Sequence, residues 1–169
     1  MDGGRHSVWA SAFPGATVLA YPAGEGPQGG PAGGVALLLP HGAHLISPRE
    51  LVPGCALEVM AALGDRPATR LVSLYLPDDH REEVLQQLRA ALPADDIPTY
   101  VGGDLNFQFF SPRAGEQASA AEFARFLDQF ALSAVAYQGP SRKDRRGSSQ
   151  IDVLAVPRSG LWRWGIKTV

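Results

Sequence analysis

Short apolar runs interrupted by glycine and proline recur along the chain, and two longer segments between them have helical spacing. Short runs bounded by turn residues are typical of strands in a sheet. The strand candidates are residues 35–39, 55–60, 70–75, 99–101, 133–136 and 151–156, with one or two more among residues 9–19. Residues 35–39 are apolar throughout, which predicts a strand buried on both faces.

Both helix candidates combine a capping signal with an apolar stripe. Asp79, followed three residues later by Glu82, indicates the start of the first helix, and Pro93 indicates its end. Ser119 and Glu122 mark the start of the second helix in the same way. The stripes are Val84, Leu85, Leu88 and Leu92 in the first helix and Phe123, Phe126, Leu127 and Phe130 in the second. Because the helices separate pairs of strands, this order predicts a layered α/β domain.

Residues 22–34 form a tract rich in glycine and proline. Such a composition supports neither a helix nor strand pairing. The residues before the tract are too few to fold alone, so we expect a mobile surface loop rather than a linker between domains.

The segment of most chemical interest is Gly102-Gly103-Asp104-Leu105-Asn106, which follows a short strand. Alternate residues of a strand share a face, so Asp104 and Asn106 are expected on the same side, and the glycines leave room for another backbone or a ligand. A carboxylate beside a carboxamide can hold a hard metal ion or orient a water molecule. The same pattern also forms an ordinary turn, which is its more frequent use.

Two further residues favour a functional role for this segment. Tyr75 ends the strand before the first helix, and that helix can return the chain to an adjacent parallel strand that leads to Asp104. Asp152 lies inside an apolar strand candidate, and a buried carboxylate has to be paired, hydrogen-bonded or liganded.

The charge balance narrows the range of partners. The 169 residues contain 15 Lys and Arg against 17 Asp and Glu, which excludes a protein that binds nucleic acid by bulk positive charge alone. A local basic segment consists of Arg142, Lys143, Arg145 and Arg146, in a loop flanked by Gly and Ser. The segment is either a solvated loop or a binding site for a phosphate backbone.

Composition also bears on location. Cys55 is the only cysteine, so the chain cannot form an internal disulfide. We find no signal peptide and no apolar run near the roughly 20 residues needed to cross a bilayer. These features predict a soluble intracellular or nuclear protein without a membrane partner.

Four segments together resemble the endonuclease/exonuclease/phosphatase family in order and approximate spacing. They are Gly-Gly-Val-Ala at 33–36, Leu-Val-Ser-Leu-Tyr-Leu-Pro-Asp at 71–78, Gly-Gly-Asp-Leu-Asn at 102–106 and Ser-Gln-Ile-Asp-Val-Leu at 149–154. No single motif is specific, but the ordered set is. Over about residues 8–157 the chain looks most like the endonuclease domains of non-LTR retrotransposons and the related abasic-site endonucleases.

The resemblance implies a four-layer α/β sandwich, in which helices flank two packed sheets, as a single domain over residues 1–169. It also implies hydrolysis of phosphoesters, here of DNA, with Mg²⁺ or Mn²⁺. Asp104 would orient or deprotonate the attacking water, Asn106 would hold a phosphate or metal-bound oxygen, and both would be metal ligands. Tyr75 would contact the phosphate. Asp152 would orient a catalytic histidine.

The sequence departs from the family at both ends. Family members begin with strands that carry an Asn and a metal-binding Glu, whereas the only acids before Gly33 are Asp2 and Glu25. They end with Ser-Asp-His, and no Asp, Glu or His follows Asp152. We therefore expect an incomplete domain that binds Mg²⁺ weakly if at all and hydrolyses poorly. The alternatives are a catalytically inactive remnant or interaction fragment, and a phosphatase of the same fold.

Overall fold

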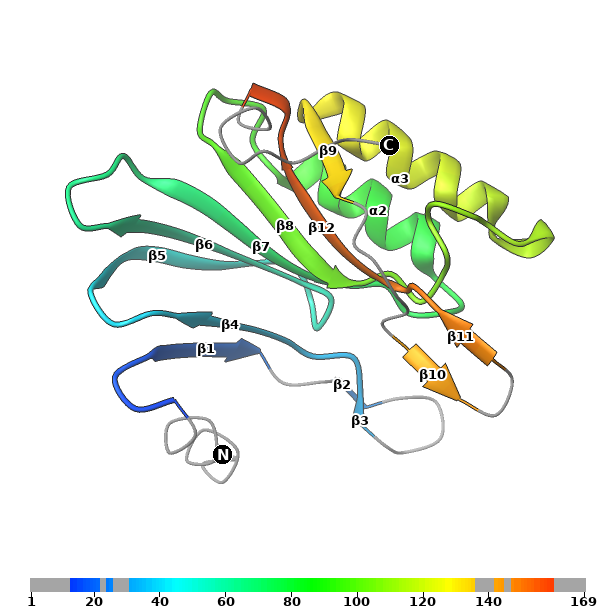
Figure 1. The fold of residues 1–169 in the computed structure, drawn as a ribbon, viewed down its shortest axis with the longest axis horizontal. Helices are drawn as coiled ribbons and strands as arrows, with labels where there is room; N and C mark the ends of the chain where they lie inside the picture. Colours follow the sequence, from blue (N-terminus) through cyan, green and yellow to red (C-terminus); the bar gives the residue numbers. More distant parts are fainter. Residues whose placement is uncertain (1–12, 22–23, 26–30, 136–141, 145–146, 160–169) are drawn as a thin grey trace.

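The centre of the fold is a six-stranded sheet with strand order β5-β6-β7-β8-β12-β9 (Figure 1). The computed structural model describes residues 13–21, 24–25, 31–135, 142–144 and 147–159. The strands of this sheet are β5 (Ala43–Val52), β6 (Ala56–Leu63), β7 (Thr69–Tyr75), β8 (Thr99–Asp104), β9 (Leu132–Val135) and β12 (Asp152–Pro157). Strands β7 and β8 are parallel, and the other neighbouring pairs are antiparallel.

Two helices cover one face of this sheet (Figure 1). Helix α2 (Arg81–Ala91) connects β7 to β8, as a crossover between parallel strands requires. Helix α3 (Gln117–Gln129) follows the short 3₁₀ turn η1 (Ala114–Glu116) and leads to β9. The predicted stripes of both helices are directed into the core. The buried core on this side includes Val72, Leu74, Leu85, Leu88, Val101, Phe107, Phe123, Phe126 and Leu132.

A second, smaller sheet lies against the other face. It pairs β1 (Thr17–Tyr21) with β4 (Val35–Leu39). A second core cluster fills the space between the two sheets, with Val35, Leu39, Leu57, Val59 and Ala61 as its buried members. The described residues thus form three layers: helices, a large sheet and a small sheet. The predicted α/β sandwich is confirmed in this incomplete form.

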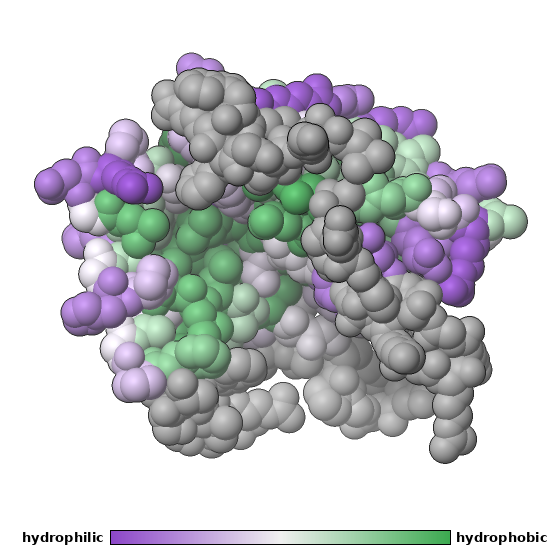
Figure 2. Space-filling model, in the orientation of Figure 1, coloured by the Kyte–Doolittle hydropathy of each residue, from purple (hydrophilic) through white to green (hydrophobic). Residues whose placement is uncertain are grey.

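Apolar side chains also reach the surface. In the orientation of Figure 1, Figure 2 shows them gathered between more polar margins. On the strands, Leu154 of β12 is 44% exposed and Leu63 of β6 is 50% exposed. Among the helices that the structure describes, none combines the length and apolarity needed to span a membrane.

The structure corrects two predictions about strands and adds a strand that was not predicted. Residues 35–39 do form a strand, but Ala36 is exposed, because β4 belongs to the two-stranded sheet and packs on one side only. The Gly/Pro tract does pair: β2 (Gly24–Glu25) and β3 (Pro31–Ala32) form a short antiparallel ladder. Strand β5 was not predicted. It is an edge strand, and the mostly polar segment at its middle, residues 46–50, is exposed.

Both predicted helix starts are also wrong. Helix α2 begins at Arg81 after His80, which makes no side-chain cap, so Asp79 and Glu82 do not form a capping box. Helix α3 begins at Gln117, and the capping box lies earlier, between Arg113 and Glu116. The predicted cap Ser119 is buried inside the helix, where its hydroxyl donates to the Glu82 carboxylate at 2.5 Å.

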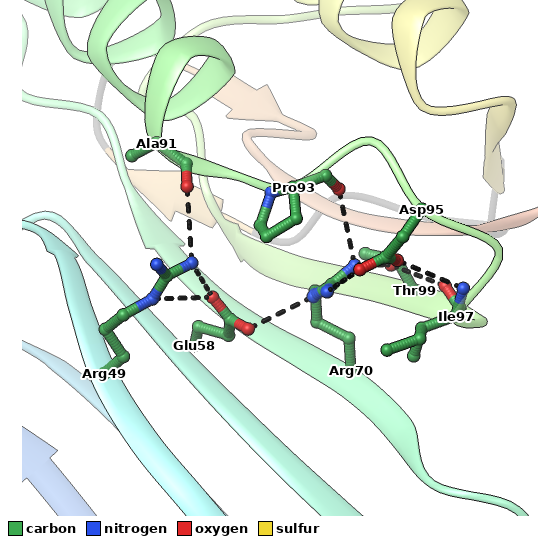
Figure 3. A network of polar contacts seen from close by, with 8 residues as sticks. All are labelled: Arg49, Glu58, Arg70, Ala91, Pro93, Asp95, Ile97 and Thr99. Atoms are coloured by element: carbon green, nitrogen blue, oxygen red, sulfur yellow. Dashed lines mark hydrogen bonds and ion pairs between the residues drawn. The ribbon is translucent and has the colours of Figure 1, made fainter.

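A buried network of hydrogen bonds and ion pairs connects the start of β7 to the helix layer (Figure 3). The Arg70 guanidinium donates to both oxygens of Asp95, at 2.9 and 2.7 Å, and to Glu58 at 3.1 Å. Glu58 also accepts from Arg49 at 2.6 Å, and Arg49 donates to the carbonyl of Ala91 at the end of α2. These bonds satisfy an arginine that is only 3% exposed.

Candidate active site

Tyr75, Asp104 and Asp152 form one row across three neighbouring strands. Asp104 is the Cα partner of Tyr75 on the parallel strand β7 and of Asp152 on the antiparallel strand β12. Residues opposite one another in a sheet project to the same face. Their chain neighbours Leu74 and Val153 belong to the core under the helices, so the row lies on the face turned away from the helices.

Asn106 joins this row through a tight turn rather than through strand alternation. Strand β8 ends at Asp104, and Asn106 has a left-handed φ of 54°. Its backbone N–H donates to Asp104 Oδ1 at 2.8 Å, its side-chain amide donates to the Leu76 carbonyl at 2.9 Å, and its side chain is hydrogen-bonded to that of Tyr75. The segment is therefore a turn, which is the alternative that the sequence left open, and this turn places Asn106 beside Asp104.

The two glycines before Asp104 have different roles. A Cβ on Gly103 would lie 1.7 Å from the Leu74 carbonyl oxygen, which no side chain could tolerate. A Cβ on Gly102 would meet only the Val153 carbonyl oxygen, at an ordinary 3.8 Å. The predicted close approach of another backbone is thus confirmed at Gly103, and it brings the ends of β7 and β8 together beneath the row.

Gly33 packs over the ring of Tyr75. It has a φ of +83°, and a Cβ there would lie 3.0 Å from the Gly54 carbonyl oxygen and 3.4 Å from two Tyr75 ring carbons. The neighbouring Gly34 N–H donates to the Gly54 carbonyl at 2.8 Å. The Gly-Gly pair before β4 thus covers one side of the tyrosine.

The surroundings of Tyr75 raise the pKa of its phenol. Burial is the largest cause, and the negative charge of Asp104 is the next. The hydrogen bond with Asn106 acts in the opposite direction but does not cancel them. The hydroxyl therefore stays protonated at neutral pH and is a hydrogen-bond donor to whatever binds beside Asp104.

Comparisons with known proteins identify the fold. No family model matches the chain, and no curated protein matches it. Among solved structures, the endonuclease domain of TRAS1, a telomere-specific non-LTR retrotransposon, matches with a TM-score of 0.64 at 19% identity, over 85% of this chain and 67% of that one. The chain has the endonuclease/exonuclease/phosphatase fold.

Other structures with this fold match over similar lengths. The human Nocturnin catalytic domain has a TM-score of 0.59 at 15% identity, over 92% of this chain and 65% of its own. The mannosyl-6-phosphatase Bt3783 of Bacteroides thetaiotaomicron has a TM-score of 0.61 at 15% identity, over 90% and 67%. The chain therefore spans about two thirds of the length of these structures, which include both nucleases and phosphatases.

Two of the predicted site features need revision within this fold. Asp152 was expected inside a strand and buried, but it is the first residue of β12 and its side chain is exposed. Arg142 and Lys143 belong to β10 (Arg142–Asp144), which pairs with β11 (Gly147–Ser149), so part of the expected basic loop is a hairpin. Arg145 and Arg146 lie outside the described residues.

Sequence reasoning missed Arg81, which contacts the site from the start of α2. Its Nη2 donates to the Asn106 carbonyl at 2.6 Å and also contacts the Asp78 carboxylate. A cation in the first turn of a helix opposes the helix dipole, and this local anomaly is the signal that could have identified it.

The described side chains supply few ligands for Mg²⁺ or Mn²⁺. In the part of the chain that the structure describes, no three His, Cys, Asp or Glu side chains come together in a way that could hold a metal ion. Asp104 and Asn106 supply one carboxylate and one carboxamide, so most of the six octahedral positions around Mg²⁺ would be left to water and phosphate oxygens.

Proposed function

We propose that this chain is a phosphoesterase of the endonuclease/exonuclease/phosphatase type that acts on phosphodiester bonds of DNA, with impaired activity. The observation that carries the proposal is the row of Tyr75, Asp104 and Asp152, with Asn106 hydrogen-bonded to two of its members. Acid, amide and phenol groups meet at strand ends in a fold shared with nucleases and phosphatases.

The chemistry of each side chain suits a step of hydrolysis. The Asp104 carboxylate can accept a proton from a water molecule as that water attacks phosphorus, while the bond from phosphorus to the leaving oxygen breaks and that oxygen takes a proton from solvent. The Asn106 amide and the protonated Tyr75 hydroxyl can donate hydrogen bonds to the phosphoryl oxygens, on which negative charge develops. Asn106 is already hydrogen-bonded to both Asp104 and Tyr75. The general base and the hydrogen-bond donors are therefore held in a fixed arrangement before the substrate binds.

We propose that Mg²⁺ or Mn²⁺ binds weakly, if at all. The described residues lack a three-ligand group, so a cation would depend on the substrate phosphate for further oxygens. Without a firmly held cation, the negative charge on the phosphoryl oxygens is poorly compensated, and we expect slow turnover. An intracellular or nuclear location would suit a DNA substrate.

The same observation supports a second candidate function, that of a folded but inactive binding domain. In that case the four residues would bind a phosphate group without hydrolysing it. The basic residues Arg142, Lys143, Arg145 and Arg146 would serve either function, as contacts to a phosphate backbone.

The test is nicking of supercoiled plasmid and of an oligonucleotide duplex with one abasic site, with Mg²⁺ or Mn²⁺ present. We expect slow cleavage that Asp104→Asn abolishes and that Asp96→Asn, on an exposed loop, leaves unchanged. Bis(p-nitrophenyl) phosphate and p-nitrophenyl phosphate separate diesterase from phosphatase activity. Hydrolysis of none of these by the wild type, or equal hydrolysis by Asp104→Asn, would refute the proposal.

A further inference from the structure

Arg81 occupies a helix position that does not favour a positive charge. It is the first residue of α2, where the positive end of the helix dipole favours acids, and Glu82 and Glu83 do follow it. Its side chain is nevertheless only 14% exposed. Tertiary contacts therefore hold this long, charged side chain against the protein.

Those contacts join the two loops that carry the candidate site. Nη2 donates to the Asn106 carbonyl oxygen at 2.6 Å, in the turn after β8. The same nitrogen contacts the carboxylate of Asp78, in the loop after β7. The guanidinium also lies over the Phe107 ring, 5.8 Å from its centroid, which limits its movement.

The Nε donor of Arg81 indicates that stability alone does not explain the residue. Nε is buried without a hydrogen-bond partner, one of only two buried side-chain polar atoms in the described chain in that state. A buried donor left unpaired lowers stability, and an apolar side chain of similar length would avoid that cost. The contact with Asn106 is what an apolar replacement could not supply.

We propose that Arg81 is the positioning residue of this site. By holding the Asn106 carbonyl, it fixes a left-handed turn that an unrestrained asparagine would adopt only part of the time. That turn aims the Asn106 N–H at Asp104 and its side chain at Tyr75. The role of these groups in hydrolysis rests on the proposed function. The positioning itself does not.

The sequence offers a selective probe, because Asn106 is its only asparagine. Protein labelled with ¹⁵N-asparagine gives one backbone amide signal and one side-chain amide pair, all from Asn106. We would compare the wild type with Arg81→Met and Arg81→Lys. Arg125→Met is the matched control, since it removes an exposed arginine of α3 that is paired with Glu122, away from the site.

We expect Arg81→Met to move both Asn106 signals several times further than Arg125→Met does. Arg81→Lys should restore part of the shift, because an ammonium keeps the charge and can donate to the same acceptors but lacks the planar guanidinium that lies over Phe107.

Unchanged Asn106 signals in Arg81→Met would overturn the proposal. If Arg81→Met does not fold, the Asn106 signals of Arg81→Lys decide, with shifts larger than those of Arg125→Met supporting the proposal and wild-type positions overturning it. This readout requires no turnover. Shifted signals in a protein that cleaves nothing would therefore refute the proposed function and leave the positioning role standing.

Discussion

Tyr75 and Asp104 are partners at the ends of the parallel strands β7 and β8, and after burial the charge of Asp104 is the largest cause of the raised pKa of Tyr75. Removing that charge should lower the pKa of the phenol. We predict that Asp104→Asn moves the Tyr75 titration to lower pH, without reaching the value of an exposed tyrosine, because burial persists.

The measurement is the absorbance of tyrosinate as a function of pH. The sequence has four tyrosines, so the curve of Tyr75→Phe is subtracted to isolate Tyr75. Asp96→Asn, which removes an exposed carboxylate elsewhere, serves as the control. A titration of Tyr75 that is the same in Asp104→Asn as in the wild type would mean that the two side chains do not share the site.

Gly103 and Gly102 make a matched pair for the close approach of β7 and β8. Gly103→Ala would place a Cβ against the Leu74 carbonyl and force the two strands apart, so we predict a loss of more than about 3 kcal/mol in the free energy of unfolding. Gly102→Ala meets only an ordinary contact and should change that free energy by less than about 1 kcal/mol. Urea unfolding of both variants provides the comparison, and equal effects would contradict the geometry.

The sequence predicted the elements that have strong local signals. Residues 70–75 and the stripe of α2 were recognisable because apolar spacing and Pro93 mark them independently of the rest of the fold. Strand β5 gave no such signal. It contains Pro48 and a polar middle, and only its pairing with β6, including two bulges, makes it a strand.

The site was predictable as a set of residues but not as a geometry. Alternation along a strand suggested that Asp104 and Asn106 share a side, whereas they are linked by a turn that begins where the strand ends. The exposure of Asp152 depends on where β12 starts, which an apolar run cannot specify to the residue. Arg81 is defined by contacts with residues far along the chain, and periodicity carries no information about those.

Asp95 should contribute to stability through Arg70, at the end of β7 and β8 opposite the site (Figure 3). Asp95→Ala would remove the best acceptors of two nitrogens of a buried guanidinium, and Nη1 would keep only its longer contacts with Thr99 at 3.3 Å and Pro93 at 3.5 Å. We predict a loss of about 1–3 kcal/mol in the free energy of unfolding at pH 7. Asp96→Ala, the neighbouring exposed carboxylate, should have little effect. If the two variants unfold at the same urea concentration, the network does not anchor this end of the sheet.

The same pair predicts how stability depends on pH. The hydrogen bond from Arg70 is the largest cause that holds the pKa of Asp95 below its usual value. A carboxyl group whose pKa is lower in the folded state stabilises it above the unfolded pKa of about 3.9 and loses that contribution as pH falls through the folded value. The difference in unfolding free energy between wild type and Asp95→Asn should therefore shrink as the pH falls below about 4. A difference that stays constant down to strongly acidic pH would show that the charge of Asp95 is not involved.

Cys55 should report on the packing beside the site, because its carbonyl accepts the Tyr75 N–H at 2.8 Å. Burial first, and the charge of Glu50 second, raise the pKa of its thiol. The rate of alkylation by iodoacetamide depends on the fraction of thiolate, so the rate should rise with pH around a midpoint above the roughly 8.5 of a free thiol.

Glu50→Gln should lower that midpoint part of the way, since burial persists and the glutamine oxygen can still accept the Gly54 N–H. The urea-unfolded protein supplies the free-thiol reference, and Glu83→Gln on the exposed side of α2 is the control. As the only cysteine, Cys55 gives a single reaction to follow, and a folded protein that reacts like the unfolded one would contradict its placement in the turn before β6.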